Sequence, residues 1–268
     1  MIDPVKMDTF ERMKTYLVSY ATGRFVADQA DLMASGLRFG VTDLRPWSNE
    51  MLRARPFYAE QKTTLDMERG SGYWLWKPFI ILETLGEMQD GDCLIYSDSG
   101  IEIVADLTPL LRIAFETPGV MLFRGNGKCR EWTKRDCFFF MNADEPRYHE
   151  AQMLDGSFIV CMRTTQARAF IAEWLESCLD RHVLTDEPNI CGLPNLPGFQ
   201  DHRHDQSVLS LLAKRRNVEL LPYPSEYVNH HRGRHPHIKR DVDEVGRSVI
   251  SLEIPRAVMM EKMRKRPR

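Results

Sequence analysis

Short apolar runs of strand length alternate along this chain with longer segments whose apolar residues recur at helical spacing. Residues 93–96 are an apolar run of the length expected for a buried strand. Residues 14–20, rich in aromatic and β-branched side chains, predict a first strand. Residues 25–39 and 165–179 instead place their apolar residues on one helical face. Strands that alternate with helices predict an α/β fold with a mixed, mostly parallel sheet flanked by helices.

The remaining pattern predicts further elements of both kinds. Further strands are expected at residues 41–47, 120–123, 156–162 and 218–221, and further helices at 78–88, 107–115 and 205–213. Residues 124–130 are expected to form a polar loop, and Thr133 is expected to cap a helix that follows it. Residues 186–201 hold three prolines and two glycines and predict a long, functional loop. We expect one domain over residues 1–268, with 222–268 as an extension that ends in a basic tail.

Composition narrows the class of protein. The chain has 268 residues, 43% of them hydrophobic, and a formal net charge of −2. That charge gives no electrostatic footprint for nucleic acid. The sequence has no apolar run of about 18 residues and no signal-peptide apolar region. The six cysteines lack any Cys-x-x-Cys spacing, which predicts free thiols in a cytoplasmic protein.

Polar residues follow the apolar run at 93–96 abruptly, as Ser97, Asp98, Ser99 and Gly100. Ligands of open α/β sheets bind just outside the carboxyl ends of the strands. A carboxylate there, beside a glycine that lets backbone approach closely, suits a cation that holds a phosphate. The same residues also fit an ordinary turn after a strand.

Residues 70–78 form a second unusual stretch, with two glycines, two tryptophans and Lys77 before a proline. A packing role is expected for at least one of Trp74 and Trp76. Lys77, at the start of a helix, has no obvious packing role, so a phosphate or carboxylate partner is expected.

Histidines gather late in the chain, with six of the eight between residues 202 and 237. The alternatives are a metal site, a basic loop that contacts phosphate, or a solvated loop. Asp205 and Gln206 open a predicted helix after the long loop. Asp205 there either interacts with the helix dipole or, with Gln206, points into a site. No zinc spacing, Walker loop or Gly-x-Ser-x-Gly elbow occurs.

In combination these segments resemble bacterial sugar-nucleotide glycosyltransferases of the GT-A fold, and more loosely the retaining glycosyltransferases of family 8. The resemblance spans roughly residues 14–235 and rests on these segments, in this order: 15–20, 70–78, 92–100, 132–136 and 204–207. It implies a GT-A-like, Rossmann-like sheet and transfer of a sugar from a nucleotide diphosphate, such as UDP, to an acceptor hydroxyl. Many proteins of this group look like lipopolysaccharide or capsule enzymes, so the resemblance also implies surface polysaccharide or glycolipid synthesis.

The resemblance also implies roles for single residues. Asp98 matches a family carboxylate that holds Mn²⁺ or Mg²⁺, whereas Gly100 stands where family 8 has a second aspartate. Asp205 and Gln206 match the pair that lines the donor sugar, and His230 and His231 align with a metal-binding loop. Donor binding is implied for eight residues: Ser19, Tyr20, Lys77, Ser99, Gly100, Arg232, Gly233 and Arg234.

Two other classes of function stay open. One is a metal-dependent hydrolase built on the histidine cluster with Asp98 and Asp205. The other is a catalytically idle protein that binds nucleotide sugars or glycans, which Gly100 permits. The expected partners of a transferase are a nucleotide-sugar donor and a glycan or lipid-linked acceptor. The basic tail over residues 256–268 could rest on the inner face of an anionic membrane, or be a solvated end.

Overall fold

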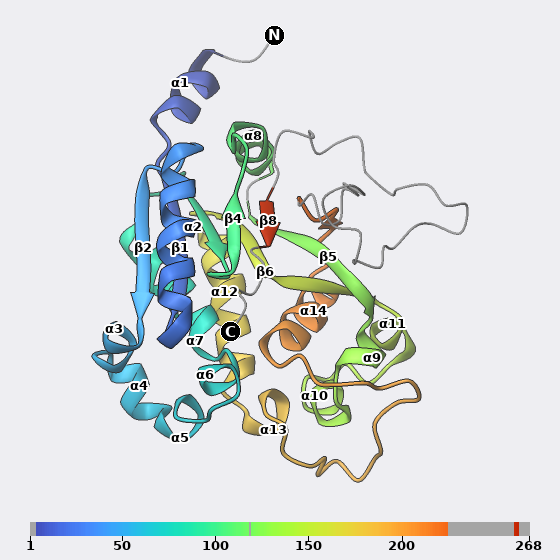
Figure 1. The fold of residues 1–268 in the computed structure, drawn as a ribbon. Coiled ribbons are helices and arrows are strands. Elements are labelled where there is room, and N and C mark those ends of the chain that lie inside the picture. Colours follow the sequence, from blue (N-terminus) through green and yellow to red (C-terminus); the bar gives the residue numbers. More distant parts are fainter. Residues whose placement is uncertain (1–3, 118, 225–259, 263–268) are drawn as a thin grey trace, which may run out of the picture.

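A six-stranded sheet forms the centre of the molecule (Figure 1). The computed structural model describes residues 4–117, 119–224 and 260–262. The strands lie in the order β2-β1-β3-β6-β5-β7. Their bounds are β1 Thr15–Ala21, β2 Asp43–Ser48, β3 Cys93–Ser97, β5 Val120–Lys128, β6 Gln152–Met162 and β7 Leu220–Leu221. Apart from this sheet, β4 (Ile101–Ile103) pairs antiparallel with β8 (Met260–Lys262).

The direction of the strands confirms the predicted mixed, mostly parallel sheet. β1 pairs in parallel with β2 and β3, and β5 pairs in parallel with β7. β6 is antiparallel to both of its neighbours, β3 and β5. The other strands of the sheet therefore all run in one direction, so that β1 and β3 end at the same edge.

Helices cover both faces of the sheet (Figure 1). The longer ones that pack on it are α2 (Val26–Arg38), α7 (Trp76–Glu87), α8 (Thr108–Glu116), α12 (Thr165–Cys178) and α14 (Asp205–Arg215). The other helical elements are α1 Pro4–Arg12, η1 Gly23–Phe25, α3 Asn49–Arg53, α4 Pro56–Glu60, α5 Lys62–Leu65, α6 Gly70–Tyr73, α9 Cys129–Trp132, α10 Arg135–Phe140, α11 Pro146–His149 and α13 Arg181–Leu184.

Two hydrophobic clusters, one on each face, hold the layers together. Leu94 and Tyr96 of β3 join the cluster with α7, α12 and α14, whereas Cys93 and Ile95 join the cluster with α2 and α8. Every residue of β3 is buried, which explains why this strand is a continuous apolar run. Each large apolar side chain buried this way contributes roughly 1.5–3 kcal/mol.

The structure corrects two local predictions. Residues 124–128, expected in a polar loop, belong to β5 and pair with the early part of β6. The side chains of Arg124 and Lys128 on this ribbon are exposed, so their polarity does not exclude a strand. Thr133 does not cap a helix, because α10 begins at Arg135 after Lys134 and the Thr133 hydroxyl has no hydrogen-bond partner.

The long loop at 186–201, predicted from its prolines and glycines, is tied to the residues just before and inside α10. The ammonium of Lys134 donates to the carbonyl oxygens of Thr185 and Glu187. The buried carboxylate of Asp136 accepts hydrogen bonds from the backbone N–H groups of Ile190 and Cys191. These bonds fix the path of the chain as it approaches α14.

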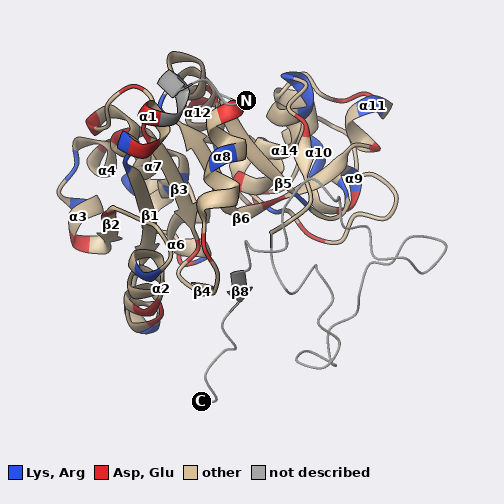
Figure 2. Cartoon of the chain, turned by 90° about the horizontal axis from the view of Figure 1, so that it is seen from above, with Lys and Arg blue, Asp and Glu red and all other residues tan. Residues whose placement is uncertain are grey.

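The structure also bears on the expectations about cysteines, membrane spans and surface charge. All six cysteines are free thiols, and five of them are buried. None of the helices in the described part of the chain could cross a membrane. Basic and acidic residues are mixed on α2, which carries Asp28, Asp31 and Arg38 (Figure 2). Residues 230–234 lie outside the described residues, and so does the basic tail at 256–268 apart from residues 260–262, which form β8.

Candidate functional site

Two adjoining cavities open at the carboxyl ends of β1 and β3. The first has a volume of about 380 Å³ and the second about 180 Å³. Trp74 and Asp98 line both of them, so the cavities meet between these two side chains. This is the sheet edge at which ligands of α/β proteins bind.

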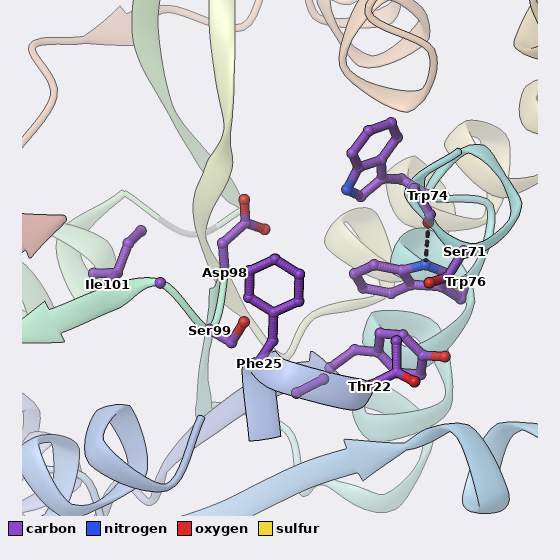
Figure 3. Close-up of a pocket in the computed structure, with 12 residues that line it drawn as sticks. Thr22, Phe25, Ser71, Trp74, Trp76, Asp98, Ser99 and Ile101 are labelled. Carbon is purple, nitrogen blue, oxygen red and sulfur yellow. Dashed lines mark hydrogen bonds between the residues drawn. The ribbon is translucent and has the colours of Figure 1, made fainter. Parts of the chain in front are cut away.

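The first cavity is lined largely by aromatic side chains (Figure 3). Tyr20 at the end of β1 stacks on Trp76 with ring centroids 4.3 Å apart. Phe25, from the turn after β1, and Trp74 complete the aromatic lining. The opposite wall is the segment that connects β3 to β4, from Asp98 to the first residue of β4, Ile101. An aromatic cavity of this kind suits a flat, partly apolar ring.

A left-handed turn forms part of the wall between the two cavities. All five residues from Gly70 to Trp74 have positive φ angles, including the non-glycine residues Ser71, Tyr73 and Trp74. Each such residue costs roughly 1–2 kcal/mol relative to the right-handed conformation. Strain of this kind persists only where the surroundings enforce it, and it is common at functional sites. Only Leu75 separates the turn from α7, whose second residue is Lys77.

The second cavity contains a buried ammonium between two carboxylates. Lys77 is 3% exposed. Its Nζ lies 3.1 Å from Asp205 Oδ2 and 3.5 Å from Asp98 Oδ1, and it donates to the Gly156 carbonyl oxygen at 3.0 Å. Burial lowers the pKa of Lys77, but Asp205 and Asp98 raise it by more, so the pKa lies above its ordinary value. Lys77 is therefore a fixed positive charge, with the carboxylate partners expected from the sequence.

Asp205 and Gln206 begin α14 and line this second cavity. Burial raises the pKa of Asp205 to about 6, against the lowering effect of Lys77. The side-chain Nε2 of Gln206 donates to the Leu154 carbonyl oxygen at 2.8 Å. Gln206 also lies against Gly156, where a Cβ atom would come within 3.2 Å of it.

Within the part of the chain that the structure describes, His202 and His204 belong to no group of side chains that could hold a metal ion. His202 Nδ1 accepts from the Lys134 backbone N–H, so Nε2 is the donor to the Val183 carbonyl oxygen. Both nitrogens are occupied, and burial holds the pKa of His202 well below its ordinary value. His202 is thus a neutral structural residue.

His204 precedes α14 in a strained conformation, with φ 51° and ψ −120°. Its Nδ1 donates to the Leu184 carbonyl oxygen at 2.8 Å, and its ring stacks on Trp74 with centroids 5.5 Å apart. Burial lowers the pKa of His204. His204 therefore links the start of α14 to the left-handed turn.

The structure brings together most of the residues singled out from the sequence. Tyr20, Ser99 and Gly100 line the first cavity, and Lys77, Asp205 and Gln206 line the second. Ser19, which was expected to bind the donor, is fully buried and lines neither cavity. The remaining residues, His230, His231, Arg232, Gly233 and Arg234, lie outside the described part.

Sequence reasoning missed three features of the lining. Phe25 was assigned only to a helix, Trp74 was given no role beyond that of a candidate packing residue, and Asp155 was not singled out. The two glycines beside Trp74 were the available signal, because glycine permits positive φ. Phe25 and Asp155 carry no such signal in the sequence.

Asp98 is the carboxylate best placed for a divalent cation. Its Oδ1 accepts from the Tyr96 hydroxyl at 2.6 Å and faces Lys77, while 40% of the side chain remains exposed. Within the described ranges, no group of three His, Cys, Asp or Glu side chains could hold a metal ion. Mg²⁺ is usually bound through one or two carboxylates plus phosphate oxygens and water. Asp98 fits that arrangement, whereas the described residues do not fit a cation held by protein alone.

Comparison with known proteins gives no matching protein family and no matching curated protein. Among solved structures, the fold is similar to mouse xyloside xylosyltransferase 1, with 10% identity, a TM-score of 0.44, and coverage of 83% of this chain and 91% of that one. It is similar to galactosyltransferase LgtC in complex with donor and acceptor sugar analogues, with 13% identity, a TM-score of 0.42, and coverage of 91% and 86%. It is also similar to the bifunctional glycosyltransferase WbbM, with 13% identity, a TM-score of 0.48, and coverage of 80% of this chain but 40% of WbbM.

These similar structures are glycosyltransferases, the class that the sequence resembles. Their identity to this chain is 10–13%.

Proposed function

We propose that this protein is a glycosyltransferase that moves a sugar from a nucleotide-diphosphate sugar to an acceptor hydroxyl. The observation that carries the proposal is the meeting of an aromatic cavity and a polar cavity at Asp98. A nucleotide sugar has the same order of parts, because a flat base and a sugar lie at either end of a diphosphate. The whole chain is proposed to act as one domain.

In this proposal the nucleoside occupies the first cavity. Tyr20, Trp76 and Phe25 provide aromatic surface for a base, and Thr22, Ser99 and the backbone of Gly100 lie beside it. The absence of a side chain at Gly100 leaves room for close approach, since a Cβ atom there would meet nothing within 4 Å. Uridine or guanosine diphosphate is the expected nucleotide.

The sugar occupies the second cavity, among hydrogen-bonding groups. Lys77, Asp205 and Gln206 face it with fixed geometry, because each is held by a backbone or ionic partner. Fixed polar groups select hydroxyl positions, since a mismatched hydroxyl leaves a buried group unpaired. Gln206 is proposed to lie near the anomeric carbon.

The diphosphate then lies at Asp98, where the leaving group develops negative charge. A Mn²⁺ or Mg²⁺ ion carried by the nucleotide would neutralise that charge, with Asp98 as its ligand from the described residues. Lys77 adds a permanent positive charge 3.5 Å behind the Asp98 carboxylate. His230, His231, Arg232, Gly233 and Arg234 are proposed to contact the same diphosphate. If transfer retains the configuration at the anomeric carbon, the leaving phosphate can serve as the base, and no side-chain base is needed.

The acceptor is proposed to be a glycan or a lipid-linked sugar in surface polysaccharide or glycolipid synthesis. The enzyme is proposed to act in the cytoplasm, with the basic tail on the inner face of the membrane. The neutral His202, whose two nitrogens are both hydrogen-bonded, counts against a hydrolase built on the histidine cluster.

Thermal unfolding with nucleotides tests the proposal. A ligand that binds the native state alone at 100 times its Kd stabilises the fold by about 2.7 kcal/mol. We expect a rise in Tm with millimolar uridine or guanosine diphosphate and Mn²⁺, and none with inorganic phosphate and Mn²⁺. If no nucleoside diphosphate shifts the Tm, the proposed donor site is wrong.

A further inference from the structure

The indole of Trp74 lies at the junction of the two cavities and presents a free donor to it. Trp74 lines both cavities and is half-buried. Among the described residues, no hydrogen-bond partner is found for its N–H, and the nitrogen is not enclosed by protein. Figure 3 shows the nitrogen edge of the ring turned toward the side of the cavity on which Asp98 lies.

The left-handed turn holds this ring in place with little freedom. A Cβ atom on Gly70 would lie 2.3 Å from Trp74 Cε3, so the Gly70 backbone packs directly on the ring. A Cβ atom on Gly72 would lie 2.6 Å from the Leu65 Cα atom. Trp76 Nε1 also donates to the Gly70 carbonyl oxygen at 3.0 Å. Both glycines have positive φ, so the sequence permits this turn only with glycine at these positions.

Contacts from distant segments reinforce the turn. His204 stacks on the Trp74 ring with an angle of 20° between the ring planes. Arg69, directly before the turn, pairs with Asp186 at 2.8 Å and with Asp201 at 2.7 Å. A strained segment that is fixed from both ends keeps its side chain in one position without a substrate.

We propose that Trp74 is a substrate-positioning residue whose indole N–H donates a hydrogen bond to a diphosphate oxygen at the junction of the cavities. The inference rests on the proposed transferase function and adds a residue to it. The junction is the place of the diphosphate because the aromatic cavity lies on one side and the polar cavity on the other. A neutral donor opposite Asp98 orients the diphosphate without adding charge, and the pre-formed turn lowers the entropy lost on binding.

The test compares a nucleoside with its diphosphate on the full chain and on the Trp74→Phe variant. Phenylalanine keeps an aromatic ring and removes the N–H. The probes are uridine, guanosine and their diphosphates with Mn²⁺, measured by calorimetry or by ligand-observed NMR. We expect the variant to bind the diphosphate about tenfold or more weakly and the nucleoside within twofold of the unaltered protein, since only the diphosphate reaches the N–H.

A second variant tests the turn itself. Gly70→Ala places a methyl group against the Trp74 ring and should give the same selective loss of diphosphate affinity. Gly86→Ala is the matched control, because a Cβ atom there meets nothing within 4 Å. Unchanged diphosphate affinity in Trp74→Phe, or an equal loss for nucleoside and diphosphate, overturns the inference while leaving the donor site intact. Absence of binding by the unaltered protein counts against the proposed function itself.

Discussion

Replacement of Lys77 by methionine removes the buried ammonium and keeps an unbranched side chain of similar length. Asp205, which is 3% exposed, then loses the charge that lies 3.1 Å from its Oδ2 atom. Asp98 loses a weaker partner at 3.5 Å and stays partly solvated. The main effect is therefore one buried carboxylate without a compensating charge.

The expected cost follows from that geometry. Removal of one partner of a buried ion pair typically destabilises a protein by about 3–5 kcal/mol. For a domain of this size, 1 kcal/mol corresponds to about 2–4 °C in Tm, so a fall of roughly 6–20 °C is expected. Neutralisation of both partners in Lys77→Met/Asp205→Asn should cost clearly less than the sum of the single variants.

The loss of stability in Lys77→Met should also depend on pH. The pKa of Asp205 is about 6 in the folded protein, above its ordinary value. The folded state therefore binds more protons than the unfolded state between about pH 4 and pH 6, and an ionised Asp205 costs stability above that window. Without Lys77, the pKa of Asp205 rises further, because Lys77 lowers it. Lys77→Met should thus be less destabilising at pH 5 than at pH 8.

The measurement is urea unfolding at pH 5 and pH 8 of four proteins: the unaltered protein, Lys77→Met, Asp205→Asn and the double variant. Lys62→Met serves as a control, since Lys62 is an exposed lysine of a surface ion pair. A cost below 1 kcal/mol for Lys77→Met at pH 8, or equal costs at both pH values, would refute the assignment of Lys77 as the buried counter-charge of Asp205.

Three further predictions concern turnover and location. Asp98→Asn should abolish turnover of the donor because it removes the carboxylate at the junction, and full activity of this variant in kinetic assays would place the site elsewhere. Gln206→Ala should lower kcat at least tenfold while the affinity for nucleoside diphosphate, measured by calorimetry, stays within twofold; near-normal turnover would contradict its place at the sugar. Removal of residues 256–268 should reduce co-sedimentation with anionic vesicles, and equal pelleting of both forms would exclude the tail as a membrane contact.

β3 and Lys77 are two features that the local sequence pattern was sufficient to predict. β3 could be predicted because burial on both faces makes it a continuous apolar run that ends at Asp98. Lys77 stood out because a charged residue directly before a proline at a helix start needs a partner. Its main partner, Asp205, is far away in the sequence, so the pairing itself needed the structure.

Other features could not be predicted because distant contacts decide them. Ser71, Tyr73 and Trp74 prefer right-handed conformations, and packing against Leu65 and His204 overrides that preference. His202 was assigned to a candidate metal cluster, yet its two partners come from Lys134 and Val183. Composition and spacing cannot distinguish such a structural histidine from a ligand.

The most direct test of the central claim is incubation of the pure protein with a panel of nucleotide sugars, followed by measurement of released nucleotide. We expect slow release from one donor in the presence of Mn²⁺, acceleration by a glycan acceptor, and no release by Asp98→Asn. Release of free sugar or inorganic phosphate at a rate that no acceptor changes would indicate a hydrolase instead. Binding of a nucleotide sugar without any release would contradict catalysis and leave a binding protein.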